Sequence, residues 1–179
     1  MATSDDRRDA FETLFRRHHA AVRAYVRRRN PNAATDDAVA ETFLVAWRRL
    51  DLIGEDPLPW LLGVARRVLA NEHRGDRRRR ALLERLIGAP KAAADLGWEP
   101  PPAMDAELAE AMAGLSPRER EALLLVAWEG LEPARAAQAA GCSPSAFRVR
   151  LHRARRRVAD HLAATASTEP RSLVTKETR

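Results

Sequence analysis

The segment PARAAQAAGCSPSAFRVRLHRARRRV, residues 133–158, contains two helical patterns separated by a short turn. Pro133 suits the first turn of a short helix, and Gly141 supplies the left-handed residue at which such a helix ends. Ser143 and Pro144 then begin a longer helix. A helix of about eight residues, a tight turn and a longer helix are the spacing of a helix-turn-helix. The apolar positions expected to form its shared core are Leu131, Ala136, Ala137, Ala140, Cys142, Phe147 and Leu151.

The second helix of this motif is strongly basic, because residues 143–158 hold six arginines and no acidic residue. The major groove of B-DNA accommodates one α-helix, whose N-terminal half reaches base edges while its flanks contact phosphates. Arg148 and Arg150 are therefore expected to contact bases, and the later arginines to face phosphate or solvent. The alternative interpretation is an arginine-rich final helix on a small bundle.

The charge of the whole chain supports a polyanionic partner. The 179 residues carry a formal net charge of +6, and a second basic patch at residues 66–80 holds seven arginines against Glu72 and Asp76. Two dense basic patches on one protein favour a nucleic-acid ligand. The single cysteine, Cys142, excludes an internal disulfide and favours a reducing, cytoplasmic setting. The N-terminus has no apolar core of signal-peptide length, and no apolar run is long enough to span a membrane.

The remaining sequence predicts an all-α fold of two small helical domains joined by a proline-rich linker. We expect domains at residues 1–88 and 105–163, a linker at 89–104, and a disordered tail at 164–179. Within the first domain, Thr35 caps a helix, residues 51–59 form a loop, and residues 77–87 form a separate short helix. In the second domain, Ser116 and Glu119 form a capping box. The linker predicts two domains that move independently, and its Trp98 has no assigned contact.

No group of residues suggests catalysis. The five histidines are dispersed, Cys142 has no nearby ligand partner, and no glycine-rich phosphate loop is present. The sequence therefore predicts a protein that is not an enzyme and has no metal or cofactor.

Three stretches resemble one family. The run GLSPREREALLLVAWEGLEPARAAQAAGCSPSAFRVRLHRARRRV is similar to the promoter-binding C-terminal domain of extracytoplasmic-function (ECF) sigma factors, members of the sigma-70 family. TDDAVAETFLVAWRRLD, followed by PWLLGVARRVLANEHR, is similar to their N-terminal domain. The resemblance covers residues 8–160 and implies a cytoplasmic, nucleoid-associated protein that binds core RNA polymerase and directs promoter-specific initiation. An anti-sigma protein is a further partner that the resemblance allows.

The resemblance implies three sets of contact residues. Recognition of the promoter −35 element falls to Arg135, Ser145, Arg148, Val149, Arg150 and Arg153. Recognition of the single-stranded −10 element falls to Arg66, Arg67, Asn71 and Arg74. Binding of the core polymerase falls to Asp36, Asp37, Glu41 and Trp47.

Several positions depart from the family pattern. Arg67 stands where asparagine is frequent, Asn71 where aspartate is, and Val149 where serine is, so the promoter sequence preference is open. The helix before the recognition helix has alanines where larger aliphatic residues are usual, and Phe147 is expected to fill part of that volume. Two other functions remain open at this point: a helix-turn-helix regulator that binds DNA alone, and a sigma-like protein that binds polymerase without reading a promoter.

Overall fold

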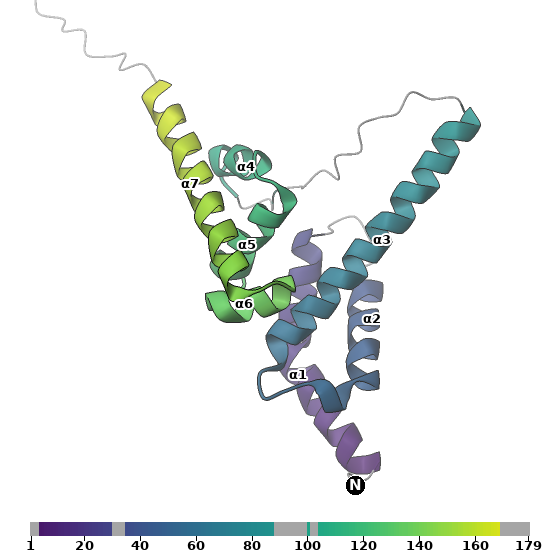
Figure 1. Cartoon of the computed structure of the whole chain (residues 1–179). Coiled ribbons are helices and arrows are strands. Elements are labelled where there is room, and N and C mark those ends of the chain that lie inside the picture. The colour runs from purple at the N-terminus through teal and green to yellow at the C-terminus, as the bar shows by residue number, and fades with distance from the viewer. Residues whose placement is uncertain (1–3, 30–34, 88–99, 101–103, 169–179) are drawn as a thin grey trace, which may run out of the picture.

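The computed structural model of the chain describes residues 4–29, 35–87, 100 and 104–168 (Figure 1). The N-terminal half contains α1 (Ser4–Arg29), α2 (Thr35–Arg48), the short 3₁₀ turn η1 (Leu50–Leu52) and α3 (Pro57–Ile87). The C-terminal half contains α4 (Ala106–Ala113), α5 (Pro117–Ala127), α6 (Pro133–Ala140) and α7 (Pro144–Thr168). Within these ranges there is no strand, which confirms the all-α prediction. No helix in them is long and apolar enough to cross a membrane.

Three boundaries differ from the sequence-based expectation. Residues 77–87 are the end of a continuous α3 and not a separate helix, because Gly75 alone costs only about 1 kcal/mol against the helix formers around it. The expected loop at 51–59 is shorter, since Pro57 occupies the first position of α3. Helix α7 extends to Thr168, so the first residues of the expected tail are helical. Trp98, most of the linker, and the tail beyond Thr168 lie outside the described residues.

Each half has its own buried residues, and the two sets join in one apolar cluster. In the N-terminal half, α1, α2 and α3 bury their facing stripes: Val22, Tyr25, Val26, Val39, Phe43, Ala46, Leu61, Leu62 and Ala65. In the C-terminal half, α5, α6, α7 and the connection before α6 bury Leu125, Leu131, Ala136, Ala137, Phe147 and Leu151. The predicted capping box is present, because the Ser116 side chain accepts from the Glu119 N–H and the Glu119 carboxylate accepts from the Ser116 N–H at 3.1 Å.

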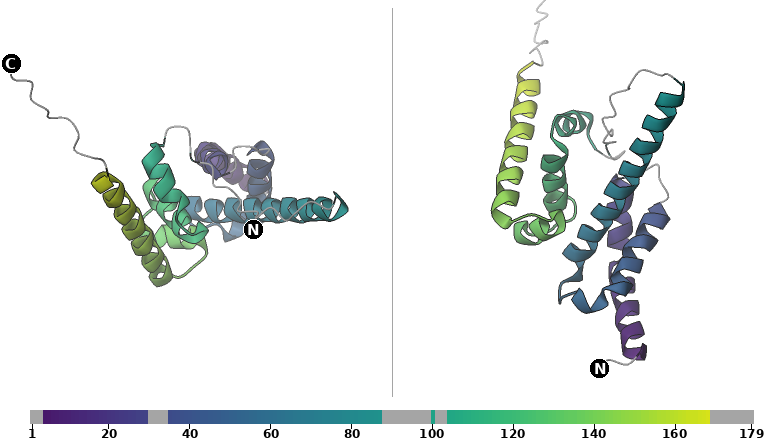
Figure 2. Two further views of the ribbon diagram at one scale, coloured as in Figure 1. Left: turned by 90° about the horizontal axis from the view of Figure 1, so that it is seen from above. Right: turned by 45° about the vertical axis from the view of Figure 1, so that its right-hand side comes forward.

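The two halves pack against each other in the structure, and their independent movement in the free chain stays a prediction. Helix α6 lies against α3, and the right-hand view of Figure 2 shows the C-terminal parts of α3 and α7 spreading apart from this contact. Gly63 of α3 allows this close approach, since a Cβ at that position would lie 3.3 Å from the carbonyl oxygen of Ala139 in α6. The sequence of the proline-rich linker does not predict this contact, because the surfaces of α3 and α6 that meet are formed by residues far apart in the sequence.

Candidate nucleic-acid interface

The turn between α6 and α7 has the predicted helix-turn-helix geometry. Gly141 adopts φ +64°, in the left-handed region where glycine is strongly favoured. Its N–H donates to the Gln138 carbonyl, and the Cys142 N–H donates to the Ala137 carbonyl, each at 3.1 Å. The hydroxyl of Ser143 then accepts from the Ala146 N–H at 3.3 Å, which satisfies a backbone donor at the start of α7.

One side of α7 is buried and the other is open to solvent. Phe147, Leu151 and Ala154 face the core. Five of the six predicted −35 residues are exposed: Ser145, Arg148, Val149 and Arg153 on α7, and Arg135 on α6. The exposed face also carries His152, which was not predicted as a contact, and Arg156, one of the arginines expected to face phosphate or solvent. These two residues follow Val149 by three and seven residues, and this helical spacing alone would have placed them on the same face of the helix as Val149.

Arg150 does not share this face with Arg148. Residues two positions apart on an α-helix differ by about 200° around its axis. The side chains of Arg148 and Arg150 therefore lie at opposite edges of the open face. Arg150 is half-buried and lines a pocket of about 410 Å³ between the two halves, together with Arg66, Arg118 and Glu121. The two arginines predicted from sequence as equivalent base contacts are therefore in different surroundings.

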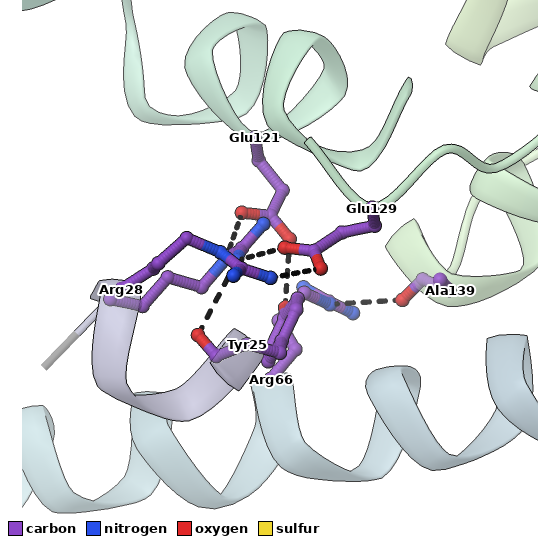
Figure 3. Close-up of polar contacts among 7 residues, drawn as sticks. Tyr25, Arg28, Arg66, Glu121, Glu129 and Ala139 are labelled. Carbon is purple, nitrogen blue, oxygen red and sulfur yellow. Dashed lines mark hydrogen bonds and ion pairs between the residues drawn. The ribbon is translucent and has the colours of Figure 1, made fainter. Parts of the chain in front are cut away.

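Two further predicted DNA contacts are engaged within the molecule. The Arg135 guanidinium of α6 donates to the Asp56 carboxylate just before α3, and this hydrogen bond raises the pKa of Arg135. The Nε of Arg66 in α3 donates to the Ala139 carbonyl of α6 at 3.3 Å (Figure 3). Arg66 and Arg135 thus link the halves; Arg66 is half-buried, whereas the Arg135 side chain keeps 47% of its surface exposed.

The other predicted −10 residues form a row along α3. Arg67, Asn71 and Arg74 are exposed and spaced by four and three residues, so they share one helix face. The Arg74 guanidinium donates to the side-chain oxygen of Asn71. Arg67 and Asn71 line a groove of about 620 Å³ between α2 and α3. This face therefore combines two guanidinium groups with an amide side chain.

The predicted polymerase-binding residues of α2 divide into two pairs. Asp37 and Glu41 are exposed and line the same groove as Arg67 and Asn71, and the exposed Leu44 follows one turn later. Asp36 instead accepts from Arg23 of α1 at 3.2 Å. Trp47 packs edge-on against Phe11, with ring centroids 5.2 Å apart. The four residues therefore belong to two neighbouring surfaces of α2.

The later arginines of α7 have both structural and electrostatic roles. Arg157 forms an ion pair with Glu119 of α5 at 3.1 Å. Hydrogen bonding from the Ser116 hydroxyl lowers the pKa of Glu119 below its ordinary value of 4.5, and the nearby charges of Arg157 and Arg153 act in the same direction. One of the predicted solvent-facing or phosphate-facing arginines thus holds α7 to α5.

Across the residues that the structure describes, no group of histidine, cysteine, aspartate and glutamate side chains is arranged to hold a metal ion. The site consists of a helix-turn-helix with an open basic face and a second helix that presents arginine and amide side chains. These features define an all-α protein of the helix-turn-helix, DNA-binding class.

Comparison with known proteins places the chain within this class. Residues 105–158 match the family model "Sigma-70, region 4", and residues 14–79 match "Sigma-70 region 2". RNA polymerase sigma factor CarQ of Myxococcus xanthus is 32% identical over 152 residues, covering 83% of this chain and 87% of that protein. The ECF RNA polymerase sigma factor SigL of Mycobacterium tuberculosis is 30% identical over 148 residues, covering 78% and 81%.

Solved structures share the fold. The sigma factor RpoE of Bartonella quintana, in complex with the anti-sigma factor NepR, has a TM-score of 0.59 and 24% identity, covering 86% of this chain and 96% of that one. CnrH, in complex with the cytosolic domain of CnrY, has a TM-score of 0.58 and 27% identity, covering 88% and 90%. The chain belongs to the sigma-70 family of RNA polymerase sigma factors, within the ECF group, and directs promoter-specific transcription initiation.

Proposed function

We propose that two surfaces of the chain divide the promoter between them. Residues 105–163 read the duplex −35 element, residues 1–88 bind core RNA polymerase and open the −10 element, and residues 89–104 connect them. The observation that carries this proposal is the open face of α7, where Ser145, Arg148, Val149 and Arg153 are exposed opposite the buried Phe147 and Leu151. A helix held by its apolar side presents its polar side to a major groove.

The −10 surface is the exposed row of Arg67, Asn71 and Arg74 on α3. Guanidinium groups bind phosphates of a separated strand, and the Asn71 amide has a donor and an acceptor for a base edge. Arg66, the residue before Arg67, is instead hydrogen-bonded to the Ala139 carbonyl of α6. The arginine at position 67 favours phosphate contact over base reading.

The surface for core polymerase is the exposed side of α2. Asp37 and Glu41 supply negative charge, and Leu44, 44% exposed, supplies an apolar contact beside them. Such a mixture suits a partner with a basic and partly apolar surface. Asp36 and Trp47 would extend this surface toward α1.

The chain itself supplies promoter choice and strand opening, and the polymerase supplies the chemistry, so no enzymatic activity is assigned to it. Its place of action is then the cytoplasm, at the nucleoid. The solved relatives RpoE and CnrH are described in complex with an anti-sigma factor and with the cytosolic domain of CnrY. An anti-sigma protein is accordingly a proposed partner of this chain.

Substitution of the α7 arginines tests the −35 assignment. We expect Arg148→Ala to reduce transcription from a cognate promoter by about 5- to 150-fold, because one base contact is worth about 1–3 kcal/mol. Arg150→Ala should have a smaller effect, since Arg150 lies at the edge of the open face. Affinity for core polymerase should not change in either variant.

The control is Arg27→Ala, which removes one exposed positive charge from α1. Equal losses of transcription for Arg148→Ala and Arg27→Ala would mean that the overall charge of the chain, and not a base contact by Arg148, determines promoter binding. Tight core binding without initiation at any promoter would instead identify a polymerase-binding protein that reads no promoter.

A further inference from the structure

Three arginine side chains line one pocket between the two halves of the molecule. Arg66 comes from α3, Arg118 from the first turn of α5 and Arg150 from α7, and the pocket has a volume of about 410 Å³. Among the residues described along its wall, Glu121 is the single acid. Sites for small molecules typically have volumes of about 300–1,000 Å³. The pocket therefore has the size of a ligand site and an excess of positive charge.

Glu121 does not neutralise these arginines, because both of its carboxylate oxygens are bound to other side chains. The Tyr25 hydroxyl donates to Oε1 at 2.8 Å, and the Nε of Arg29 donates to Oε2 at 2.9 Å (Figure 3). Arg28 and Arg29 also pair with Glu129, so these two arginines and two glutamates balance in charge. The three guanidinium groups of the pocket are therefore left without a compensating carboxylate in the part of the chain that the structure describes.

The guanidinium groups of the pocket also have unused hydrogen-bond donors. The Nε of Arg66 donates to the Ala139 carbonyl at 3.3 Å, and its two Nη atoms have no acceptor among the described residues. Within the same ranges, Arg118 and Arg150 form no hydrogen bond or ion pair. Each guanidinium group has five N–H donors. Most of these donors are therefore available to an acceptor that enters the pocket.

The position of Arg118 is explained neither by helix stability nor by promoter contact. Arg118 follows the N-cap Ser116 and Pro117 in the first turn of α5. A cation there is opposed by the helix dipole, which favours anions at the N-terminus. Arg66 and Arg150 are assigned to the −10 and −35 elements, but Arg118 is assigned to neither. A ligand that contacts all three arginines accounts for the position of Arg118.

The turn after α6 fits around the side chain of Arg66. A Cβ at Gly141 would lie 2.9 Å from an Nη of Arg66. The glycine that gives the turn its φ of +64° therefore also leaves the space that this guanidinium occupies. Together with the hydrogen bond to Ala139, this contact holds Arg66 in place before any ligand binds. A donor that is already held in place loses less conformational entropy when it binds.

We propose that the pocket binds a small anion that carries two or more phosphate groups. Arginine is suited to phosphate, because its planar guanidinium donates two parallel N–H groups to two phosphate oxygens. One phosphate group carries about −1.5 to −2 at pH 7, so three guanidinium groups require at least two phosphates for charge balance. Inorganic oligophosphates and nucleotides share this chemistry, and Pro117 and Ala140 give the wall apolar groups that an organic part can contact. Binding requires no promoter, so it goes beyond the proposed function.

Isothermal titration calorimetry of the full chain tests the site. The probes are inorganic tripolyphosphate, ATP and orthophosphate, each without magnesium and at constant ionic strength. We expect one saturable site for tripolyphosphate. Orthophosphate should bind at least about tenfold more weakly, because it engages fewer charge-assisted hydrogen bonds. Tighter binding of ATP than of tripolyphosphate would support a nucleotide as the ligand, and equal or weaker binding of ATP would support an inorganic oligophosphate.

Variants of the pocket arginines locate the binding site. Arg118→Gln and Arg150→Gln should each weaken binding of tripolyphosphate at least about tenfold, because each removes one guanidinium group. Arg150→Lys should retain part of the affinity, since it keeps the charge but loses the planar fork. The matched control is Arg155→Gln, which makes the same charge change at an exposed position of α7 outside the pocket. Circular dichroism without ligand checks that every variant keeps its helix content.

Three results would overturn the proposal. The first is the absence of saturable binding for both tripolyphosphate and ATP. The second is an equal affinity for orthophosphate and tripolyphosphate, which would exclude a ligand with several phosphate groups. The third is an equal loss of affinity in Arg150→Gln and Arg155→Gln, which would mean that the anion is attracted by the overall charge of the chain.

Discussion

Replacement of Phe147 by alanine tests how the recognition helix is held. Phe147 has 0% exposure and packs among the small side chains Ala136, Ala137 and Ala139, which are 0–1% exposed. A buried Phe→Ala change costs about 3–5 kcal/mol, depending on how far neighbours relax into the cavity. The neighbouring alanine side chains cannot rotate into this cavity. We therefore expect the loss of unfolding free energy to lie near the upper end of this range. At about 0.05–0.15 kcal/mol per residue, a domain of roughly 60 residues has only about 3–9 kcal/mol to lose.

The expected result is loss of folded structure in the C-terminal half. A loss of about 4 kcal/mol corresponds to a fall in Tm of roughly 15–30 °C for a domain of this size. Thermal denaturation by circular dichroism gives the size of the effect, and hydrogen exchange of α6 and α7 against α1 and α2 gives its location. The control is Val149→Ala two residues away, where a 49% exposed side chain should change stability by no more than about 0.5 kcal/mol. Equal Tm values for the two variants would refute the assigned core.

Two other expectations follow from the electrostatics. Because the pKa of Glu119 is lowered in the folded chain, its stabilisation is complete above the ordinary value of 4.5 and is lost as pH falls through the lowered value. Glu119→Gln should therefore flatten the acid side of the Tm–pH profile, and an unchanged profile would exclude Glu119 as its source. Asp37→Arg should weaken binding to core polymerase, because it reverses a charge in the groove between α2 and α3. The same reversal at Asp36, which pairs with Arg23, should have a smaller effect, and equal effects would mean that the groove has no special role.

Local features were predictable from the sequence because local residues determine them. Gly141 and Pro144 fix the turn of the helix-turn-helix, and Phe147 with Leu151 fixes the buried side of α7. The capping box of Ser116 and Glu119 is likewise contained within four residues.

The surroundings of individual arginines were not predictable in this way. Arg66 and Arg135 find their partners 73 and 79 residues away in the sequence, across the contact of two halves. Neighbours in sequence also separate on a helix, as with Asp36 and Asp37, because adjacent residues differ by about 100° around the axis. The composition shows that the chain is rich in arginine, but it does not show which arginines are free to contact DNA. Tertiary packing distinguishes the exposed Arg67, Arg148 and Arg153 from the arginines that contact the other half of the molecule.

Reconstitution with purified bacterial core RNA polymerase tests whether the chain acts as a sigma factor. Gel filtration measures formation of the complex, and sequencing of RNA 5′ ends made by that complex on fragmented genomic DNA maps its start sites. We predict a stable complex whose starts share one −35/−10 pair. Absence of core binding, together with binding of the chain alone to duplex DNA, would contradict the account.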